Sequence, residues 1–283
     1  MQNVCFIINP FSAKKKYQPI LNAILAENPN ANYYISESLE GTFNYIKEHW
    51  DSTEIFVAIG GDGTISSVAS QLINSNKILA IFPAGSGNGF SNENGFDKSV
   101  KNLLGKIKKG DFHKIDTFTV NGEFSINVSG VGFDGKVVKE FEKTSRGLSN
   151  YVKVSIKTFF SYKPITIEFH EEILQKYNGK YLMMNIANTR QFGNNAYIAP
   201  HASKTDGKVE LALVKKFPLG YGLGFAYKMF AKKLKADNYL NYVSTSSVKL
   251  TVDSEDWHID GEYRKISSPV SVQVLPKSLC ILK

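Results

Sequence analysis

Residues 54–70 read EIFVAIGGDGTISSVAS, and this segment determines which fold we expect the chain to adopt. An apolar run at residues 55–59 meets the glycine-rich turn GGDGT at residues 60–64, and a segment with helical spacing follows. Strand, glycine loop and helix in this order cradle phosphate, because glycines let backbone N–H groups approach an anion and the helix N-terminus adds its positive dipole end. The alternative is a tight strand-to-helix turn with an exposed Asp62. The complete GGDGT string favours phosphate binding.

Alternating β-rich and amphipathic runs extend on both sides of this segment. The β-rich runs occupy residues 4–8, 33–35, 55–59 and 78–82, and the amphipathic runs occupy residues 17–26, 43–50, 65–73 and 97–109. The last amphipathic run stops at Gly110, a typical helix end. This rhythm predicts a parallel sheet flanked by helices, which we assign to a Rossmann-like α/β domain over residues 1–112.

The pattern changes in the second half of the chain, where short strands dominate. Asn121-Gly122 between two β-rich runs is the strongest short hairpin signal. Further β-rich runs lie at residues 165–169, 181–187, 209–214, 248–252 and 270–275, with helical runs at residues 137–143, 151–160 and 219–234. We expect a β-sandwich domain over residues 113–283 with helical insertions, and we leave open a return of its last strand to the first domain.

A second glycine-rich loop, PAGSGNGF at residues 83–90, follows another predicted strand. Two such loops at the carboxyl ends of neighbouring parallel strands face one crevice. Ser86 and Asn88 offer small hydrogen-bonding side chains there. Ordinary turn chemistry is the alternative for this loop taken alone.

Polar residues also end the first predicted strand, where Asn9 and Ser12 precede lysines at positions 14–16. A carboxamide, a hydroxyl and nearby cations suit the phosphates or ribose of a nucleotide. The alternative is a capped helix start followed by solvated lysines.

Composition limits the cellular setting and the partners. A net charge of +8 and a pI near 9.2 indicate attraction to nucleic acid, an anionic membrane surface or a phosphate-rich ligand. The best apolar stretch, residues 221–231, is too short for a membrane span and carries Lys228. Because the first ten residues hold no basic leader or cleavage site, we expect a cytoplasmic location, and we expect Cys5 and Cys280 to be buried and reduced.

Six strings in a fixed order resemble the diacylglycerol kinase catalytic family, which includes sphingoid-base kinases and bacterial lipid kinases. The strings are Asn9-Pro10-Phe11-Ser12-Ala13, residues 60–64, residues 83–90, Gly130-Val131-Gly132-Phe133-Asp134, Asn188 with Ile198-Ala199-Pro200 and Asp206-Gly207, and Ile259-Asp260-Gly261-Glu262. The resemblance covers nearly the whole chain. It implies a nucleotide-binding domain like that of NAD kinase and phosphofructokinase, and a β-sandwich that closes the cleft.

The resemblance also implies an ATP-dependent lipid kinase that uses Mg²⁺. It makes Asp62, Asp260 and Glu262 the catalytic residues, with Glu262 as the base that deprotonates the lipid hydroxyl, and Asp62 also a metal ligand. Asp206, in the turn at residues 203–208, would hold an ion of structural role, and an ordinary Asp-Gly hairpin turn is the alternative. The implied nucleotide-binding set is Asn9, Ser12, Ser36, Gly60, Gly61, Asp62, Gly63, Thr64, Gly85, Ser86, Gly87 and Asn88. On the expectation that alternate strand residues share a face, Asp260 and Glu262 would approach one site across Gly261, and a polar strand-to-turn connection is the alternative for this segment.

The chain departs from the family's pattern at several positions. Ser66 and Ser67 stand where an Asn-Glu pair is usual, Gly89 replaces a loop Asp, and Ala13 replaces a Gly. Ser36 stands for the threonine expected after the second strand. These changes bear on rate and metal use more than on fold.

Rival functions are an NAD kinase-like activity, which shares GGDGT, and a catalytically inactive lipid-binding regulator. The acidic residues Asp62, Asp260 and Glu262 favour an enzyme, and the absence of an aromatic-basic reading surface argues against nucleic acid. The expected partner is a lipid at the inner membrane face, contacted peripherally, and a homodimer is left open. Residues 221–240 are the candidate contact, and a helix packed on the sandwich is the alternative.

Overall fold

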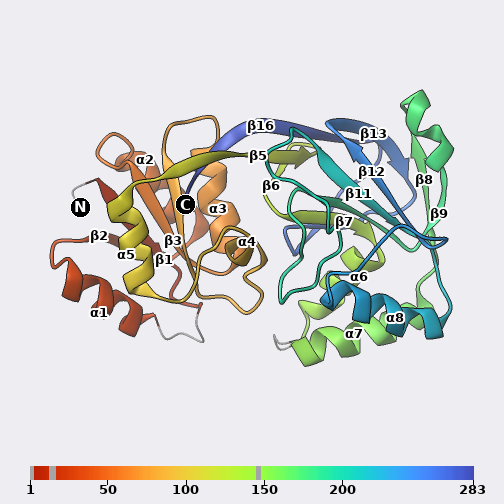
Figure 1. Ribbon diagram of the computed structural model, residues 1–283, viewed down its shortest axis with the longest axis horizontal. Helices are drawn as coiled ribbons and strands as arrows, with labels where there is room; N and C mark the ends of the chain where they lie inside the picture. The colour runs from red at the N-terminus through yellow and green to blue at the C-terminus, as the bar shows by residue number, and fades with distance from the viewer. Residues whose placement is uncertain (1–2, 13–16, 145–147) are drawn as a thin grey trace. The chain divides into compact units, whose positions relative to one another are not determined.

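The computed structural model describes residues 3–12, 17–144 and 148–283, which form two compact units (Figure 1). The first unit comprises Met1–Ile115 with Lys277–Lys283, and the second comprises Asp116–Pro276. The position of Ala13 and the lysines at 14–16 lies outside the described residues.

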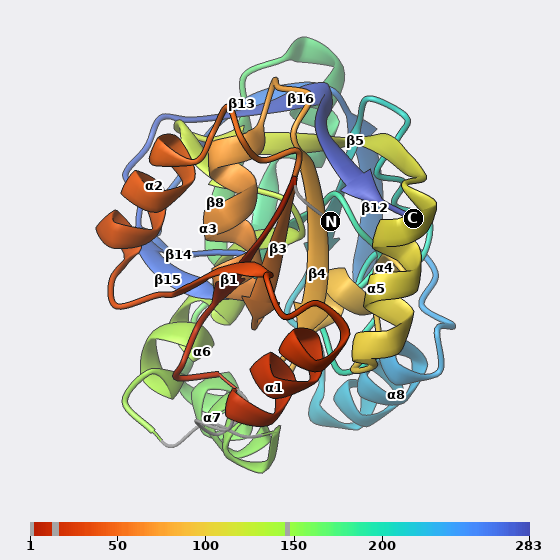
Figure 2. The same ribbon diagram turned by 90° about the vertical axis from the view of Figure 1, so that its left-hand side faces the viewer.

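The first unit is built on a parallel sheet with helices on both faces (Figure 2). Its strands, in the spatial order β2-β1-β3-β4, are β1 Val4–Ile8, β2 Asn32–Ile35, β3 Ile55–Gly60 and β4 Ile78–Pro83. Its helices are α1 Gln18–Glu27, α2 Leu39–Glu48, α3 Asp62–Leu72, α4 Gly89–Glu93 and α5 Val100–Lys109. The strands β1, β3 and β4 are buried along their whole length, as expected for a parallel sheet covered on both sides. Helix α5 ends where Gly110 adopts a left-handed φ of 73°.

The second unit is a β-sandwich with added helices. Its elements are β5 Phe112–Val120, β6 Glu123–Ser125, β7 Val128–Gly132, α6 Phe133–Phe141, α7 Leu148–Ser161, β8 Ile165–Phe169, the 3₁₀ helix η2 Glu172–Tyr177, β9 Gly179–Tyr181, β10 Met183–Ala187, β11 Val209–Val214, α8 Leu219–Phe230, β12 Leu240–Thr245, β13 Ser247–Val252, β14 Asp256–Ile259, β15 Glu262–Lys265 and β16 Val270–Leu282. One layer has the order β12-β11-β10-β7-β14-β15, and the other has the order β16-β13-β8-β9.

The two faces of strand β10 show how the sandwich is packed. Met184 and Ile186 point into the core shared by the two layers, and Met183 and Ala187 point into a second cluster beneath α8. This is the two-residue period of a strand buried on both faces. The predicted fold class, an α/β unit followed by a β-sandwich, is confirmed.

Strand β16 is longer than the predicted run at residues 270–275 and serves both units. It pairs antiparallel with β13 through residues 270–273, and its end pairs parallel with β4 through Cys280 and Ile281. Both cysteines are buried and unpaired, as expected. Sequence patterns did not predict β12, β14 and β15.

Candidate active site

The two glycine-rich loops of the first unit lie against each other. Strands β3 and β4 are in parallel register, with Gly60 opposite Pro83, so both loops leave the same edge of the sheet. A Cβ added at Gly85 would lie 2.6 Å from the Cα of Gly61, and one added at Gly61 would lie 3.3 Å from the Cα of Gly85. The loops therefore touch through bare backbone, which leaves amide groups accessible at closer range than side chains would allow.

Asp62 is the first residue of α3, and its carboxylate lies beside the second loop. The Gly89 N–H donates a long hydrogen bond of 3.4 Å to Asp62 Oδ2, and a Cβ at Gly87 would lie 3.3 Å from the same oxygen. A negative charge in the first turn of a helix is favoured by the helix dipole. The structure thus brings the GGDGT carboxylate and the second glycine loop together, as the sequence predicted for facing loops.

Asn88 closes the second loop on itself. Its side-chain Nδ2 donates to the Gly85 carbonyl at 2.9 Å, and its Oδ1 accepts from the Gly85 N–H at 3.0 Å. The residue is buried and holds a left-handed φ of 50°, which asparagine tolerates better than most residues. Its amide shapes the loop, whereas the Ser86 side chain is exposed.

Asn9 joins the end of β1 to the GGDGT loop. Its Nδ2 donates to Thr64 Oγ1 at 2.8 Å, and its Oδ1 accepts from the Phe11 N–H at 2.9 Å. The Ser12 N–H donates to the Asn9 carbonyl at 3.2 Å. Asn9, Ser12 and Thr64 are therefore linked by hydrogen bonds at the edge where the glycine loops emerge.

Ser36 follows β2 at the same edge, but its hydroxyl is used locally. It lies 2.7 Å from Thr42 Oγ1 and donates to the Ser38 carbonyl at 3.3 Å. These contacts support the first turn of α2, whose N-cap is Ser38. No contact joins the Ser36 side chain to the Asp62 loop among the hydrogen bonds of the described residues.

Asp260 and Glu262 do not alternate along one strand, so that part of the sequence interpretation is wrong. Ile259 is paired directly with Glu262, and Asp260 and Gly261 form the two-residue turn between β14 and β15. Both turn residues have positive φ, 49° and 87°, as in the Asn-Gly and Asp-Gly hairpin turns. The turn sends the two carboxylates in different directions.

The Asp260 carboxylate is buried and bound to the segment before β7. Oδ1 accepts from the Ser125 hydroxyl at 2.7 Å and from the Asn127 N–H at 2.9 Å, and Oδ2 accepts from the Ile126 N–H at 3.0 Å. Three donors on one carboxylate fix the turn in place. This residue is a positioning group in the structure.

The Glu262 carboxylate is exposed. Arg264 Nη2 donates to Glu262 Oε2 at 2.9 Å, and Arg264 Nε lies 3.7 Å from Glu123 Oε2. The Glu262 side chain keeps 52% of its surface accessible. The Glu262 carboxylate is therefore accessible to a molecule in solution, whereas the Asp260 carboxylate is enclosed by its donors.

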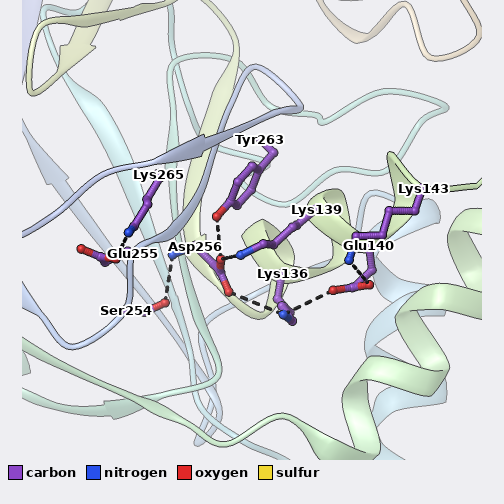
Figure 3. Close-up of polar contacts among 9 residues, drawn as sticks. All are labelled: Lys136, Lys139, Glu140, Lys143, Ser254, Glu255, Asp256, Tyr263 and Lys265. Atoms are coloured by element: carbon purple, nitrogen blue, oxygen red, sulfur yellow. Dashed lines mark hydrogen bonds and ion pairs between the residues drawn. The ribbon is translucent and has the colours of Figure 1, made fainter.

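A polar network fastens the β14–β15 hairpin to α6 (Figure 3). Lys139 Nζ and Tyr263 Oη donate to Asp256 Oδ1 at 2.7 Å and 2.8 Å, and Lys136 Nζ lies 4.0 Å from Asp256 Oδ2. Burial raises the pKa of Asp256, but the hydrogen bonds from Lys139 and Tyr263 and the charges of Lys139 and Lys136 outweigh burial and hold the pKa below its usual value. Lys139 has a raised pKa, chiefly because of its hydrogen bond to Asp256.

A buried polar cluster that the sequence analysis did not identify lies under the same hairpin. His258 Nε2 is 3.0 Å from Asp134 Oδ2, and Asn185 Nδ2 donates to the same oxygen. Because the Gly261 N–H donates to His258 Nδ1 at 3.3 Å, we assign the ring proton to Nε2. The GVGFD string contained Asp134, and His258 stands two residues before Asp260, which were the available signals.

This cluster explains the glycine at position 130. A Cβ there would clash with Asp134 Oδ2 and would lie 2.6 Å from Asn185 Nδ2. Gly130 is therefore required by packing around the buried Asp134 carboxylate, and one partner of that carboxylate, His258, also contacts the turn at Gly261.

The turn at residues 203–208 is not the tight hairpin turn considered as an alternative, because β10 and β11 are joined by the long connection 188–208. Asp206 is exposed, and its Oδ1 accepts from the Lys208 N–H at 3.0 Å. The buried Asp116 accepts from the Gly207 N–H at 2.7 Å. Within the described residues no group of three His, Cys, Asp or Glu side chains is placed to hold a metal ion, so a cation here would depend on backbone oxygens.

The serines that replace the family's Asn-Glu pair lie on α3. Ser67 Oγ donates to the Gly63 carbonyl at 2.9 Å, a bond within its own helix. Asp62 is therefore the acidic side chain that α3 contributes.

No helix in the described part of the chain has the length and apolar character needed to cross a membrane.

Comparisons with known proteins agree with this architecture. Residues 3–120 match the model of the diacylglycerol kinase catalytic domain, and residues 127–283 match the YegS C-terminal NAD kinase β-sandwich-like domain. The chain is 24% identical over 277 residues to a diacylglycerol kinase of Bacillus subtilis, covering 93% of this chain and 90% of that protein.

Two further proteins resemble this chain over most of its length. A probable lipid kinase YegS of Salmonella arizonae is 25% identical over 237 residues, covering 80% of this chain and 77% of that protein. The crystal structure of a diacylglycerol kinase from Bacillus anthracis superposes with a TM-score of 0.74 at 19% identity, covering 99% and 96% of the two chains. With both domains matched in order, this chain belongs to the family of diacylglycerol kinases and YegS-like lipid kinases.

Proposed function

We propose that the protein transfers the γ-phosphoryl group of ATP to the hydroxyl group of a lipid. The observation that carries the proposal is the contact of two bare glycine loops around Asp62, with the Cβ positions of Gly85 and Gly61 blocked by backbone. Phosphoryl transfer requires mainly positioning and charge neutralisation. We propose that backbone donors of this loop pair position the phosphates. Membership of a lipid kinase family supports the choice of acceptor.

The donor set around Asp62 fits Mg²⁺ bound together with a nucleotide. Mg²⁺ retains several waters and is held in kinases by one or two carboxylates plus substrate phosphates, rather than by a cage of side chains. Asp62 supplies one carboxylate, and we propose that backbone amides of the adjoining glycine loops bind phosphate oxygens, which the close backbone contact of Gly61 and Gly85 supports. When bound there, the ion would neutralise charge on the phosphates.

We propose that Glu262 is the general base that accepts the proton of the lipid hydroxyl. The Glu262 carboxylate is exposed, whereas Asp260 is bound by three donors and acts by fixing the turn. Transfer of the hydroxyl proton to Glu262 Oε1 or Oε2 would let the lipid oxygen form a bond to the γ-phosphorus, while the bond from this phosphorus to the β–γ bridging oxygen breaks and ADP leaves. Asn9, Ser12 and the loop residues Gly60–Thr64 and Gly85–Asn88 are proposed to hold the nucleotide, with Ser36 acting through α2.

A lipid acceptor also requires contact with a membrane surface. With no spanning helix in the described residues, we propose peripheral association.

The test is transfer of label from γ-labelled ATP to a total lipid extract, followed by identification of the labelled lipid by mass spectrometry. A labelled phosphomonoester of a hydroxylated lipid is expected. Nucleotide binding without transfer to any lipid would favour the inactive regulator, and labelled NADP in a parallel reaction with NAD would favour the NAD kinase-like activity.

A further inference from the structure

Helix α8 exposes a row of large apolar side chains. Leu219, Leu223, Tyr227 and Phe230 are 57%, 77%, 67% and 44% exposed, and their spacing puts them on one face of the helix. The opposite face carries Phe225, which is buried against the six-stranded layer. The helix is therefore packed on the sandwich, which is the alternative interpretation of residues 221–240, and it still presents an apolar face outward.

Helix α7, which the sequence analysis did not consider as a contact surface, exposes a matching row. Val152, Ile156 and Phe160 follow each other at four-residue intervals and are 44%, 55% and 67% exposed. Lys153 and Lys157, at the same interval, flank the row and are exposed.

The two helices are joined by aromatic packing. Phe217, just before α8, stacks on Phe159 of α7 with ring centroids 5.3 Å apart and on Phe225 of α8 at 5.5 Å. Lys216 Nζ donates to the Phe159 carbonyl at 2.5 Å and to the Tyr162 carbonyl at 3.2 Å. Figures 1 and 2 both show α7 and α8 along the same edge of the second unit.

The positive charge of the chain is concentrated in these segments. Residues 148–163 and 215–235 contain nine lysines and no Asp or Glu. The whole chain has 34 Lys and Arg against 26 Asp and Glu, so the remainder has 25 basic and 26 acidic residues. The entire excess of positive charge therefore belongs to the two helices and the residues next to them. Eight of these lysines are exposed, and Lys216 is partly buried in the helix junction.

We propose that the outward rows of α7 and α8, here called the α7/α8 face, dock the protein on an anionic lipid surface. Exposed Leu, Ile and Phe side chains flanked by lysines match the apolar interior and the anionic head groups of such a leaflet. A second copy of this chain fits less well, because an interface of the face with itself would oppose like charges. This inference rests on the proposed lipid kinase function, which explains why the protein would dock on a membrane. Docking itself is measured without catalysis.

The test is co-sedimentation of the full chain with vesicles of phosphatidylglycerol and phosphatidylcholine, and with phosphatidylcholine alone. The wild type should bind the anionic vesicles, and added salt should weaken the binding. Lys153→Gln with Lys157→Gln should weaken binding by about 25-fold, because each lysine near an anionic surface contributes about fivefold. Ile156→Gln with Leu223→Gln should weaken it by about tenfold or more, because two large apolar side chains no longer insert.

Matched controls lie elsewhere on the second unit. Ile173 is 77% exposed on η2, and Ile173→Gln should leave vesicle binding unchanged. Lys176→Gln with Lys180→Gln repeats the charge change at two exposed lysines outside the face. All variants change exposed side chains, and thermal unfolding verifies that each is folded.

Selective loss in the α7/α8 variants supports the proposal. Equal binding by face and control variants, or no binding of wild type to anionic vesicles, would overturn it. A wild-type dimer that the Ile156→Gln/Leu223→Gln variant dissociates would also overturn it and identify the face as an interface between copies. Activity on a short-chain soluble lipid is measured separately. Lack of this activity in the wild type rejects the proposed function. If the α7/α8 face variants keep this activity, the proposed function stands whatever the result with vesicles.

Discussion

Asp62 is the acidic residue whose surroundings most closely match a role in phosphoryl transfer. We expect Asp62→Asn to lower turnover by about thirtyfold or more, because a lost transition-state interaction of this kind costs roughly 2 kcal/mol or more. The unfolding temperature should change little, because the asparagine retains the shape and the loop backbone is unaltered. Asp51→Asn, at an exposed turn position of the same unit, is the matched control. Turnover of Asp62→Asn within about threefold of wild type would remove this carboxylate from the mechanism.

Glu262 differs from its neighbour Asp260 in being accessible. Glu262→Gln should lower kcat by about a hundredfold or more with unchanged ATP binding, because the side chain keeps its shape but no longer accepts a proton. Binding is measured by calorimetry and turnover by lipid phosphorylation. Glu123→Gln is the control, because Glu123 shares Arg264 with Glu262 and its loss disturbs the arginine alone. A parallel loss of ATP affinity would assign Glu262 to nucleotide or metal binding instead.

At the scale of elements, the contact of the two glycine loops determines the shape of the proposed nucleotide site. Gly85→Ala places a Cβ 2.6 Å from backbone and should raise the KM for ATP while destabilising the fold by about 1–3 kcal/mol. Gly105→Ala in the middle of α5 meets no atom within 4 Å and should stabilise by about 0.5–1 kcal/mol. Kinetics and chemical denaturation of the pair measure both effects. An unchanged KM in Gly85→Ala would show that the loops do not need to touch.

The junction of α6 with the β14–β15 hairpin makes stability depend on pH. Because the folded pKa of Asp256 lies below its unfolded value of about 3.9, its ionised form stabilises the fold above that value, and the contribution is lost as pH falls through the folded pKa. Asp256→Asn should cost about 1–2 kcal/mol at pH 7 and less below pH 4, measured by urea unfolding. Glu255→Gln, whose exposed carboxylate pairs with Lys265, should change stability by under about 0.5 kcal/mol. An equal cost of Asp256→Asn at both pH values would contradict the ionic origin.

Two dipeptides show what sequence patterns could and could not predict about the elements. Asn121-Gly122 was correctly predicted as a hairpin turn, and both residues have the positive φ that this turn requires. Asp260-Gly261 carries the same signal, and the structure has the strand-to-turn connection that was the alternative interpretation of this segment. Whether a residue pair turns or continues a strand depends on the partner strand, here β7, whose preceding segment binds the Asp260 carboxylate.

At the scale of the molecule, the strand–loop–helix order predicted the parallel sheet because β1, β3 and β4 are continuous apolar runs. The site could be predicted less completely. The buried Asp134–His258–Asn185 cluster joins residues distant in sequence, and neither spacing nor composition reveals such pairs. The end of β16 was shortened in the prediction because Pro276 and Lys277 interrupt the apolar run before the buried residues 278–282.

The most direct test of the central claim uses one reaction that contains γ-labelled ATP, lipid-extract vesicles and NAD. After extraction with chloroform, the label is counted in the organic and aqueous phases for wild type and for Asp62→Asn. The proposed lipid kinase activity predicts wild-type label in the organic phase as a lipid phosphomonoester, and at least about thirtyfold less with the variant. Label confined to the aqueous phase as NADP, or lipid label that is unchanged in Asp62→Asn, would contradict it.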